Sequence, residues 1–148
     1  MATIHNEITI NAPIEKIWTA LTEIDLLDKY DPTVKTSSAI TSVKSGIGAN
    51  RKVDILDGKN WFEEKITEYK TNEALTYELT ACSFPVHKLK HSYSIEKIGN
   101  QIRVQQVMDY TVKFGLFGKV LDAMMIRKQS DTGIKQFFVG LKSYAETN

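Results

Sequence analysis

The chain has 148 residues, of which 42% are hydrophobic and 25% are charged, a composition typical of a soluble globular protein. Its 19 Lys and Arg residues nearly balance its 18 Asp and Glu residues, and the net charge of +1 excludes a broad electrostatic field for nucleic acid or an anionic membrane. The length accommodates one ordinary hydrophobic core, so we expect a single domain over residues 1–148.

Several kinds of site are also disfavoured by the sequence. Cys82 is the one cysteine, so it has no partner for an internal disulfide or a zinc site, and the N-terminal segment lacks the apolar stretch of a signal peptide. No apolar run approaches the length of about 20 residues that spans a bilayer. We therefore predict a cytoplasmic protein without membrane insertion, metal or cofactor. No phosphate-binding glycine loop or nucleophile elbow is found.

The first elements follow one another without a loop. Residues 3–10 alternate in polarity, which indicates a half-buried strand, and Asn11 is a candidate N-cap for the helix that follows. Pro13 suits the first turn of this helix, whose apolar side chains recur at helical spacing over residues 14–21. Apolar residues at 24–27 indicate a second short helix.

The rest of the chain divides into a sheet and a helix. Residues 34–114 alternate strand-like runs with turn signals, as in an antiparallel meander, with turns at 46–48, 57–58, 71–72, 83–85 and 99–100. After Phe114 the period changes to that of a long amphipathic helix, which must lie diagonally or bend, with Gly133 as the weak point. Its predicted apolar stripe is Phe117, Val120, Leu121, Met124, Met125, Ile134, Phe137, Phe138, Leu141 and Tyr144.

The hairpin turns predict which side chains share the covered face of the sheet, because opposed residues in an antiparallel pair project to the same side. A two-residue turn at 99–100 places Tyr93 opposite Gln106, and a turn at 57–58 places Arg51 opposite Glu64. The polar residues predicted to face inward are Arg51, Glu64, Tyr77, His91, Tyr93, Gln106 and Tyr110. An unsatisfied buried polar group costs roughly 1–3 kcal/mol, so we interpret this mixture as the lining of a wet or ligand-filled cavity.

A purely structural interpretation of the same residues stays open. Arg51 and Glu64 can form a cross-strand ion pair whose only role is stability, and His91 can be a core histidine whose hydrogen bonds are satisfied. Tyrosines more often form the wall of a site than take part in chemistry.

Three stretches carry a family resemblance: INAPIEKIWTALTEIDLLDKYDP, GIGANRKVDILDGKNWFEEKITEYKTNEALTYEL and FGLFGKVLDAMMIRKQSDTGIKQFFVGLKSYAE. They resemble the START-like (SRPBCC) superfamily of birch-pollen-allergen type, and more narrowly its polyketide cyclase/dehydrase branch. The resemblance implies an α+β helix-grip fold, in which a strongly curved antiparallel sheet of about seven strands wraps around a long C-terminal helix, with two short helices after the first strand. It also implies a cavity beneath that helix for an apolar or aromatic small molecule.

Three functions are compatible with these features. The first is binding or carriage of a small hydrophobic ligand such as a lipid, polyketide or isoprenoid. The candidate ligand-binding residues are Arg51, Val53, Ile55, Phe62, Glu64, Tyr77, Leu79, Leu89, His91, Tyr93, Gln106, Met108, Tyr110, Met124 and Phe137. The second is a metal-free cyclase or dehydratase in which His91 or Glu64 transfers a proton. The third is a protein-binding module that uses exposed apolar residues such as Phe84, Leu116 and Phe117.

Overall fold

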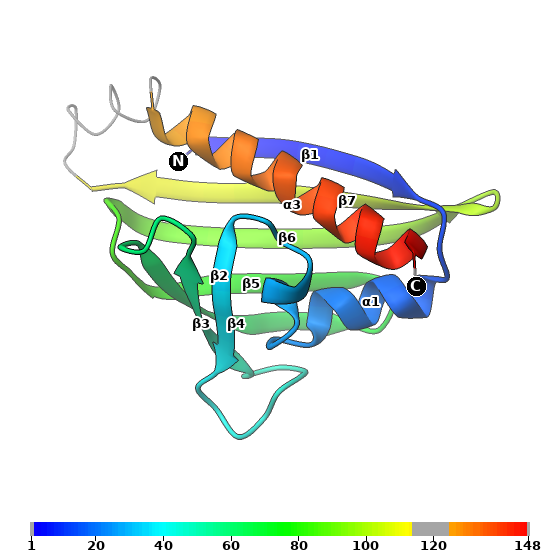
Figure 1. Ribbon diagram of the computed structural model, residues 1–148, viewed down its shortest axis with the longest axis horizontal. Helices are drawn as coiled ribbons and strands as arrows, with labels where there is room; N and C mark the ends of the chain where they lie inside the picture. Colours follow the sequence, from blue (N-terminus) through cyan, green and yellow to red (C-terminus); the bar gives the residue numbers. More distant parts are fainter. Residues whose placement is uncertain (1, 114–124, 148) are drawn as a thin grey trace.

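The structure is a computed structural model that describes residues 2–113 and 125–147. One antiparallel sheet of seven strands has the order β1-β7-β6-β5-β4-β3-β2, so each strand from β2 to β7 pairs with the next and β1 pairs with β7. The strands are β1 (Ala2–Ile10), β2 (Val34–Ala39), β3 (Asn50–Ile55), β4 (Trp61–Lys70), β5 (Ala74–Cys82), β6 (Val86–Ile98) and β7 (Gln101–Val112). Figure 1 shows β2 and β3 turning away from the direction of the longer strands, which curves the sheet strongly. The predicted α+β helix-grip architecture is confirmed.

The two short helical elements after β1 are α1 (Ile14–Thr22) and the single 3-10 turn η1 (Leu27–Lys29). The predicted N-cap was wrong: Pro13 occupies the cap position of α1, and no side chain caps the helix there. The backbone N–H of Asn11 instead donates a hydrogen bond to the Glu146 carboxylate at 2.7 Å. This contact joins the entry of α1 to the end of the C-terminal helix.

The helix α3 (Arg127–Thr147) lies obliquely across the concave face of the sheet, as Figure 1 shows. Two contacts fix it along β1: Asn6 Nδ2 donates to Asp131 Oδ1 at 3.0 Å, and Lys142 Nζ donates to the Thr9 carbonyl oxygen at 2.9 Å. The helix continues through Gly133 without a break. None of the helices in the described part of the chain is both long and apolar enough to cross a membrane.

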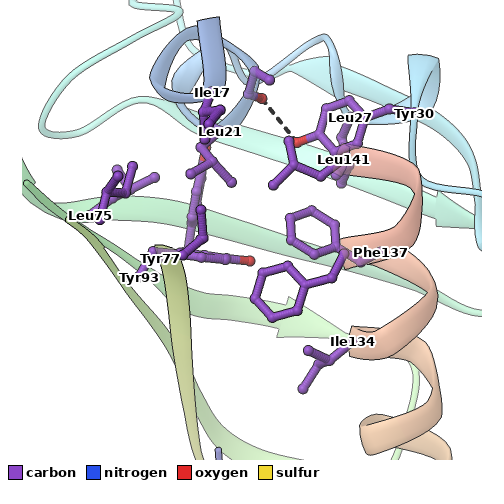
Figure 2. Close-up of a cluster of buried hydrophobic side chains, with 14 of the residues drawn as sticks. Ile17, Leu21, Leu27, Tyr30, Leu75, Tyr77, Tyr93, Ile134, Phe137 and Leu141 are labelled. Carbon is purple, nitrogen blue, oxygen red and sulfur yellow. Dashed lines mark hydrogen bonds between the residues drawn. The ribbon is translucent and has the colours of Figure 1, made fainter. Parts of the chain in front are cut away.

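The core lies between this helix and the sheet. In Figure 2, Ile134 and Phe137 reach from α3 toward Tyr77 and Tyr93 on the strands, while α1 covers one end with Ile17 and other apolar residues. The predicted stripe is confirmed for Ile134, Phe137, Phe138 and Leu141, all buried. It is wrong for Met125, which is 50% exposed. The stripe positions Phe117, Val120, Leu121 and Met124 lie outside the described residues.

Gly140 allows α3 to approach the loop after η1 closely. A Cβ atom at position 140 would lie 2.0 Å from the carbonyl oxygen of Tyr30, which is far inside van der Waals contact. Tyr30 itself is buried, and its hydroxyl donates to the Ala20 carbonyl oxygen at 2.9 Å. The helix, the loop and α1 are thus packed as one layer over the sheet.

The predicted strand register is confirmed in the hairpins at 99–100 and 57–58. Tyr93 is opposite Gln106 across β6 and β7, and Arg51 is opposite Glu64 across β3 and β4. The turn at 71–72 has Asn72 at a φ of 61°, a left-handed conformation that asparagine tolerates better than most residues. Because one face of each strand is apolar, a slip by one residue would bury the wrong side chains.

Candidate functional site

A buried ion pair lies on the inner face where β3 and β4 meet. Arg51 donates from Nε at 2.9 Å and from Nη2 at 2.6 Å, and both bonds go to the same oxygen, Glu64 Oε1. The side chains are only 5% and 2% exposed. Arg51 Nη1 and Glu64 Oε2 are also buried, and neither has a hydrogen-bond partner among the described residues. The pair therefore leaves one buried donor and one buried acceptor without hydrogen bonds.

Tyr77 flanks this pair on β5. The Arg51 guanidinium lies 4.2 Å from the centroid of the Tyr77 ring, which is a cation–π contact. The Tyr77 hydroxyl donates to the Leu21 carbonyl oxygen at 2.8 Å, so it is already used by α1. Burial raises the pKa of Tyr77 to about 12. Burial alone would lower the pKa of Arg51, but its interactions with Tyr77 and Glu64 outweigh burial and raise that pKa overall.

His91 is the more accessible polar group of the cluster. It is opposite Tyr77 across β5 and β6, and its Nδ1 lies 3.9 Å from Glu64 Oε2. The side chain is 20% exposed. Burial lowers the pKa of His91, Glu64 raises it less strongly, and Arg51 lowers it further. The imidazole is therefore neutral at pH 7, and its 3.9 Å distance from the carboxylate is too long for a hydrogen bond.

Tyr93 and Gln106 form a second polar contact farther along the same face. Gln106 Nε2 donates to the Tyr93 hydroxyl at 3.2 Å, and both residues are buried. Gln106 Oε1 is buried without a hydrogen-bond partner in the described structure. Burial raises the pKa of Tyr93 well above its usual value, so its hydroxyl stays protonated and available as a donor. The predicted inward placement of these two residues is confirmed.

The apolar lining differs between the two ends of the inner face. Leu75, Ile66 and Val104 are fully buried toward α1, whereas the apolar residues toward the other end are half-buried. These half-buried residues are Phe62, Leu79, Cys82, Phe84 and Leu89. The inner face therefore has a sealed apolar end and a partly exposed apolar end, with the Arg51–Glu64 pair and His91 beside the latter.

The remaining predicted site residues are distributed as follows. Val53, Met108, Tyr110 and Phe137 are buried in the core. Ile55 lies at the end of β3 and lines a pocket of about 350 Å³ near the turn at 57–58, whose lining does not include Arg51, Glu64 or His91. Met124 lies outside the described residues. Phe84 was expected to be exposed; it is half-buried, and its ring packs 6.3 Å from that of Phe62.

The pocket around Ile55 was not predicted from the sequence. It is lined by Lys35, Thr36, Asp54, Ile55, Gly58, Lys59, Asn60 and Trp61. Trp61 is half-buried there, and Lys52 Nζ lies 5.3 Å from the centroid of its ring. The sequence did offer one signal for this pocket: Trp61 is a large apolar residue at the start of a strand that otherwise carries many polar residues. The described residues contain no cluster of His, Cys, Asp and Glu that could hold a metal ion.

Tyr30 is another residue that the sequence did not single out. Its ring packs against Phe137 and Tyr144 of α3, with centroids 5.7 Å and 5.5 Å away. Burial raises its pKa well above the usual value, although Arg51 lowers it in part. Tyr30 therefore belongs to the same buried polar environment as the ion pair, although it comes from a loop after η1 rather than from a strand.

Comparison with known proteins agrees with this architecture. The sequence profile of the family described as polyketide cyclase / dehydrase and lipid transport matches residues 1–146. No individually curated protein gives a significant sequence match.

Solved structures share the fold at low sequence identity. A START superfamily protein from Mycobacterium smegmatis superimposes with a TM-score of 0.79 at 16% identity, covering 97% of both chains. Ara h 8.0201 has a TM-score of 0.80 at 17% identity and 99% coverage of both chains. A protein from Thermus thermophilus has a TM-score of 0.81 at 15% identity, covering 99% of this chain and 100% of that one. With its profile match over nearly the full length, this chain belongs to the polyketide cyclase / dehydrase and lipid transport family.

Proposed function

We propose that this protein binds a small, mostly apolar molecule between the sheet and α3. The apolar body of the ligand packs on the partly exposed end of the inner face, against Phe62, Leu79 and Leu89. Its polar end points toward Arg51, Glu64 and His91. The observation that carries the proposal is that Arg51 Nη1 and Glu64 Oε2 are buried without hydrogen-bond partners in the described structure, and that Glu64 is opposite Leu79 across β4 and β5.

The energetics of the ion pair favour a binding role over a structural one. Burying two charges costs more than their attraction returns unless the remaining hydrogen-bonding groups are satisfied. Here both bonds converge on Glu64 Oε1, so one oxygen and one terminal nitrogen are left over. A plain aliphatic pair would pack the same space at lower cost. A ligand that forms hydrogen bonds with the two free groups would offset the cost of burying the charges.

Family membership supports the same proposal. The family description includes lipid transport, and a pocket with apolar walls and a few oriented polar groups is the usual form of a small-molecule site. Binding needs no nucleophile or metal.

The test uses a neutral fluorescent probe, Nile red, together with native mass spectrometry of the freshly purified protein. We expect Leu89→Trp to reduce Nile red affinity by about tenfold, because the larger side chain fills the partly exposed surface. Leu56→Trp is the matched control, because Leu56 is 63% exposed in a turn. The proposal fails if neither Nile red nor a copurified organic molecule binds the wild-type protein.

A second candidate function is favoured by His91 and its surroundings. A neutral, partly exposed imidazole beside a carboxylate can act as a general base, as a metal-free cyclase or dehydratase requires. In that case, His91→Gln abolishes turnover of a linear poly-β-ketone substrate while its binding is retained. Equal loss of binding and turnover, or unchanged turnover, would argue against a catalytic His91.

A further inference from the structure

We propose that the site selects ligands whose polar end is uncharged and carries both a hydrogen-bond donor and an acceptor, such as a primary amide or a hydroxy ketone. It rejects carboxylates and ammonium groups on the same apolar body. This inference rests on the proposed function and adds the chemical class of the ligand's polar end.

The hydrogen-bonding capacity of the two free atoms requires both a donor and an acceptor. Arg51 Nη1 can only donate, and an ionised Glu64 Oε2 can only accept. A ligand group with acceptors alone, such as an ester, satisfies Arg51 and leaves Glu64 unsatisfied. A group with both functions satisfies the two atoms together, and unsatisfied buried groups are costly. Gln106 Oε1 and the Tyr93 hydroxyl supply a further acceptor and donor on the same face.

The charge of the site determines the second part of the selectivity. Arg51 already has its counterion in Glu64, so the pair has no net charge to offer an ion. The other titratable groups around the pair are His91, Tyr30, Tyr77 and Tyr93, and all four are uncharged at pH 7 because burial lowers the pKa of the histidine and raises those of the tyrosines. Asp31 also interacts with Arg51 electrostatically, but it belongs to the loop after η1, where its Oδ1 already accepts hydrogen bonds from the backbone N–H and the hydroxyl of Thr33.

An ionic ligand would therefore lose its hydration without gaining a counterion. A carboxylate placed against Arg51 Nη1 would also approach the Glu64 carboxylate, and like charges in a desolvated site repel strongly. An ammonium group placed against Glu64 Oε2 would meet the Arg51 guanidinium in the same way. A neutral group with a donor and an acceptor avoids both penalties.

The experiment compares four probes with one naphthalene body: 2-naphthamide, 2-naphthoate, methyl 2-naphthoate and 2-naphthylmethylammonium. Their dissociation constants are measured at pH 7 by competition with Nile red and by calorimetry. We expect 2-naphthamide to bind about tenfold tighter than 2-naphthoate and the ammonium probe, with the ester weaker than the amide. If 2-naphthoate binds as tightly as 2-naphthamide, the inference is overturned while the proposed function stands. If no probe binds and Nile red does not bind, both are overturned.

A charge variant tests the cause of the selectivity. Glu64→Gln removes the counterion of Arg51, so the preference should reverse and 2-naphthoate should bind more tightly than 2-naphthamide. Glu78→Gln is the matched control, because it makes the same change in net charge at an exposed position of β5, and it should keep the wild-type ranking. An unreversed ranking in folded Glu64→Gln contradicts the inference. If that variant does not fold by circular dichroism, the wild-type ranking decides alone.

Discussion

Arg51 directs two hydrogen bonds, at 2.9 Å and 2.6 Å, to a single oxygen of Glu64. This geometry differs from the fork in which the two nitrogens of a guanidinium contact the two oxygens of a carboxylate. It leaves Glu64 Oε2 on the side of His91, whose Nδ1 is 3.9 Å away. A polar centre with unused hydrogen-bonding capacity thus lies within a mostly apolar core.

The first prediction concerns the stability of this pair. Arg51→Met alone leaves the Glu64 charge buried without its partner, and we expect the free energy of unfolding to fall by about 3–5 kcal/mol. The double variant Arg51→Met/Glu64→Leu removes both charges and should be more stable than Arg51→Met. Urea denaturation of the wild type, Arg51→Met, Glu64→Leu and the double variant measures the effect. A double variant less stable than Arg51→Met would contradict it.

The second prediction compares two glycines of α3. Gly140→Ala places a methyl group 2.0 Å from the Tyr30 carbonyl oxygen, so the helix must shift, and we expect a loss of about 1–3 kcal/mol or more. Gly133→Ala meets no atom within 4 Å and should stabilise the protein by up to about 1 kcal/mol, since alanine is the better helix former. Thermal unfolding followed by circular dichroism separates the two. Equal changes in stability for the two variants would show that the close contact at Gly140 does not restrict the side chain at that position.

The third prediction concerns the acid side of the stability curve. Burial lowers the pKa of His91 in the folded state below its unfolded value near 6.5. Between those two pKa values the unfolded state binds more protons, so the contribution of His91 to stability is present above about pH 6.5 and is lost as the pH falls toward the folded pKa. We expect the difference in unfolding free energy between wild type and His91→Gln to shrink over this window.

Urea titrations at several pH values between 7.5 and 5 measure that difference. His87→Gln is the matched control, because it makes the same substitution at an exposed position of β6. A wild-type advantage that grows as the solution is acidified would reverse the assigned sign.

The fourth prediction concerns Tyr77 at alkaline pH. Its folded pKa of about 12 lies above the usual 10.0, so the folded state holds the phenol proton more tightly than the unfolded state does. The resulting contribution of Tyr77 to the free energy of unfolding is lost as the pH rises from about 10 to about 12. Tyr77→Phe should cost about 1 kcal/mol at pH 7, because the hydrogen bond to the Leu21 carbonyl is lost. The difference between the two proteins should decrease above pH 10, as measured by guanidinium denaturation. A constant difference would argue against a raised pKa.

The inner face could be predicted from the sequence because local rules fix it. Turns such as that at 99–100 set the register of each hairpin, and the period of two then places Tyr93, Gln106, Arg51 and Glu64 on the covered side. No long-range information was needed for these pairs. The N-cap of α1 was missed because the helix begins later than expected: Pro13 takes the cap position, and Asn11 lies before it, where its backbone N–H donates to Glu146, 135 positions away.

The sequence by itself determined the order of the elements and which side chains face inward, because both follow from periodicity and turn chemistry over a few residues. Only the tertiary structure decided which hydrogen-bond partners the inward polar groups have. The single Glu64 oxygen that accepts both bonds, the use of Tyr77 by α1 and the half-buried end of the apolar lining depend on the curvature of the sheet and the placement of α3. These are set by packing between segments far apart in the chain, which no local pattern records.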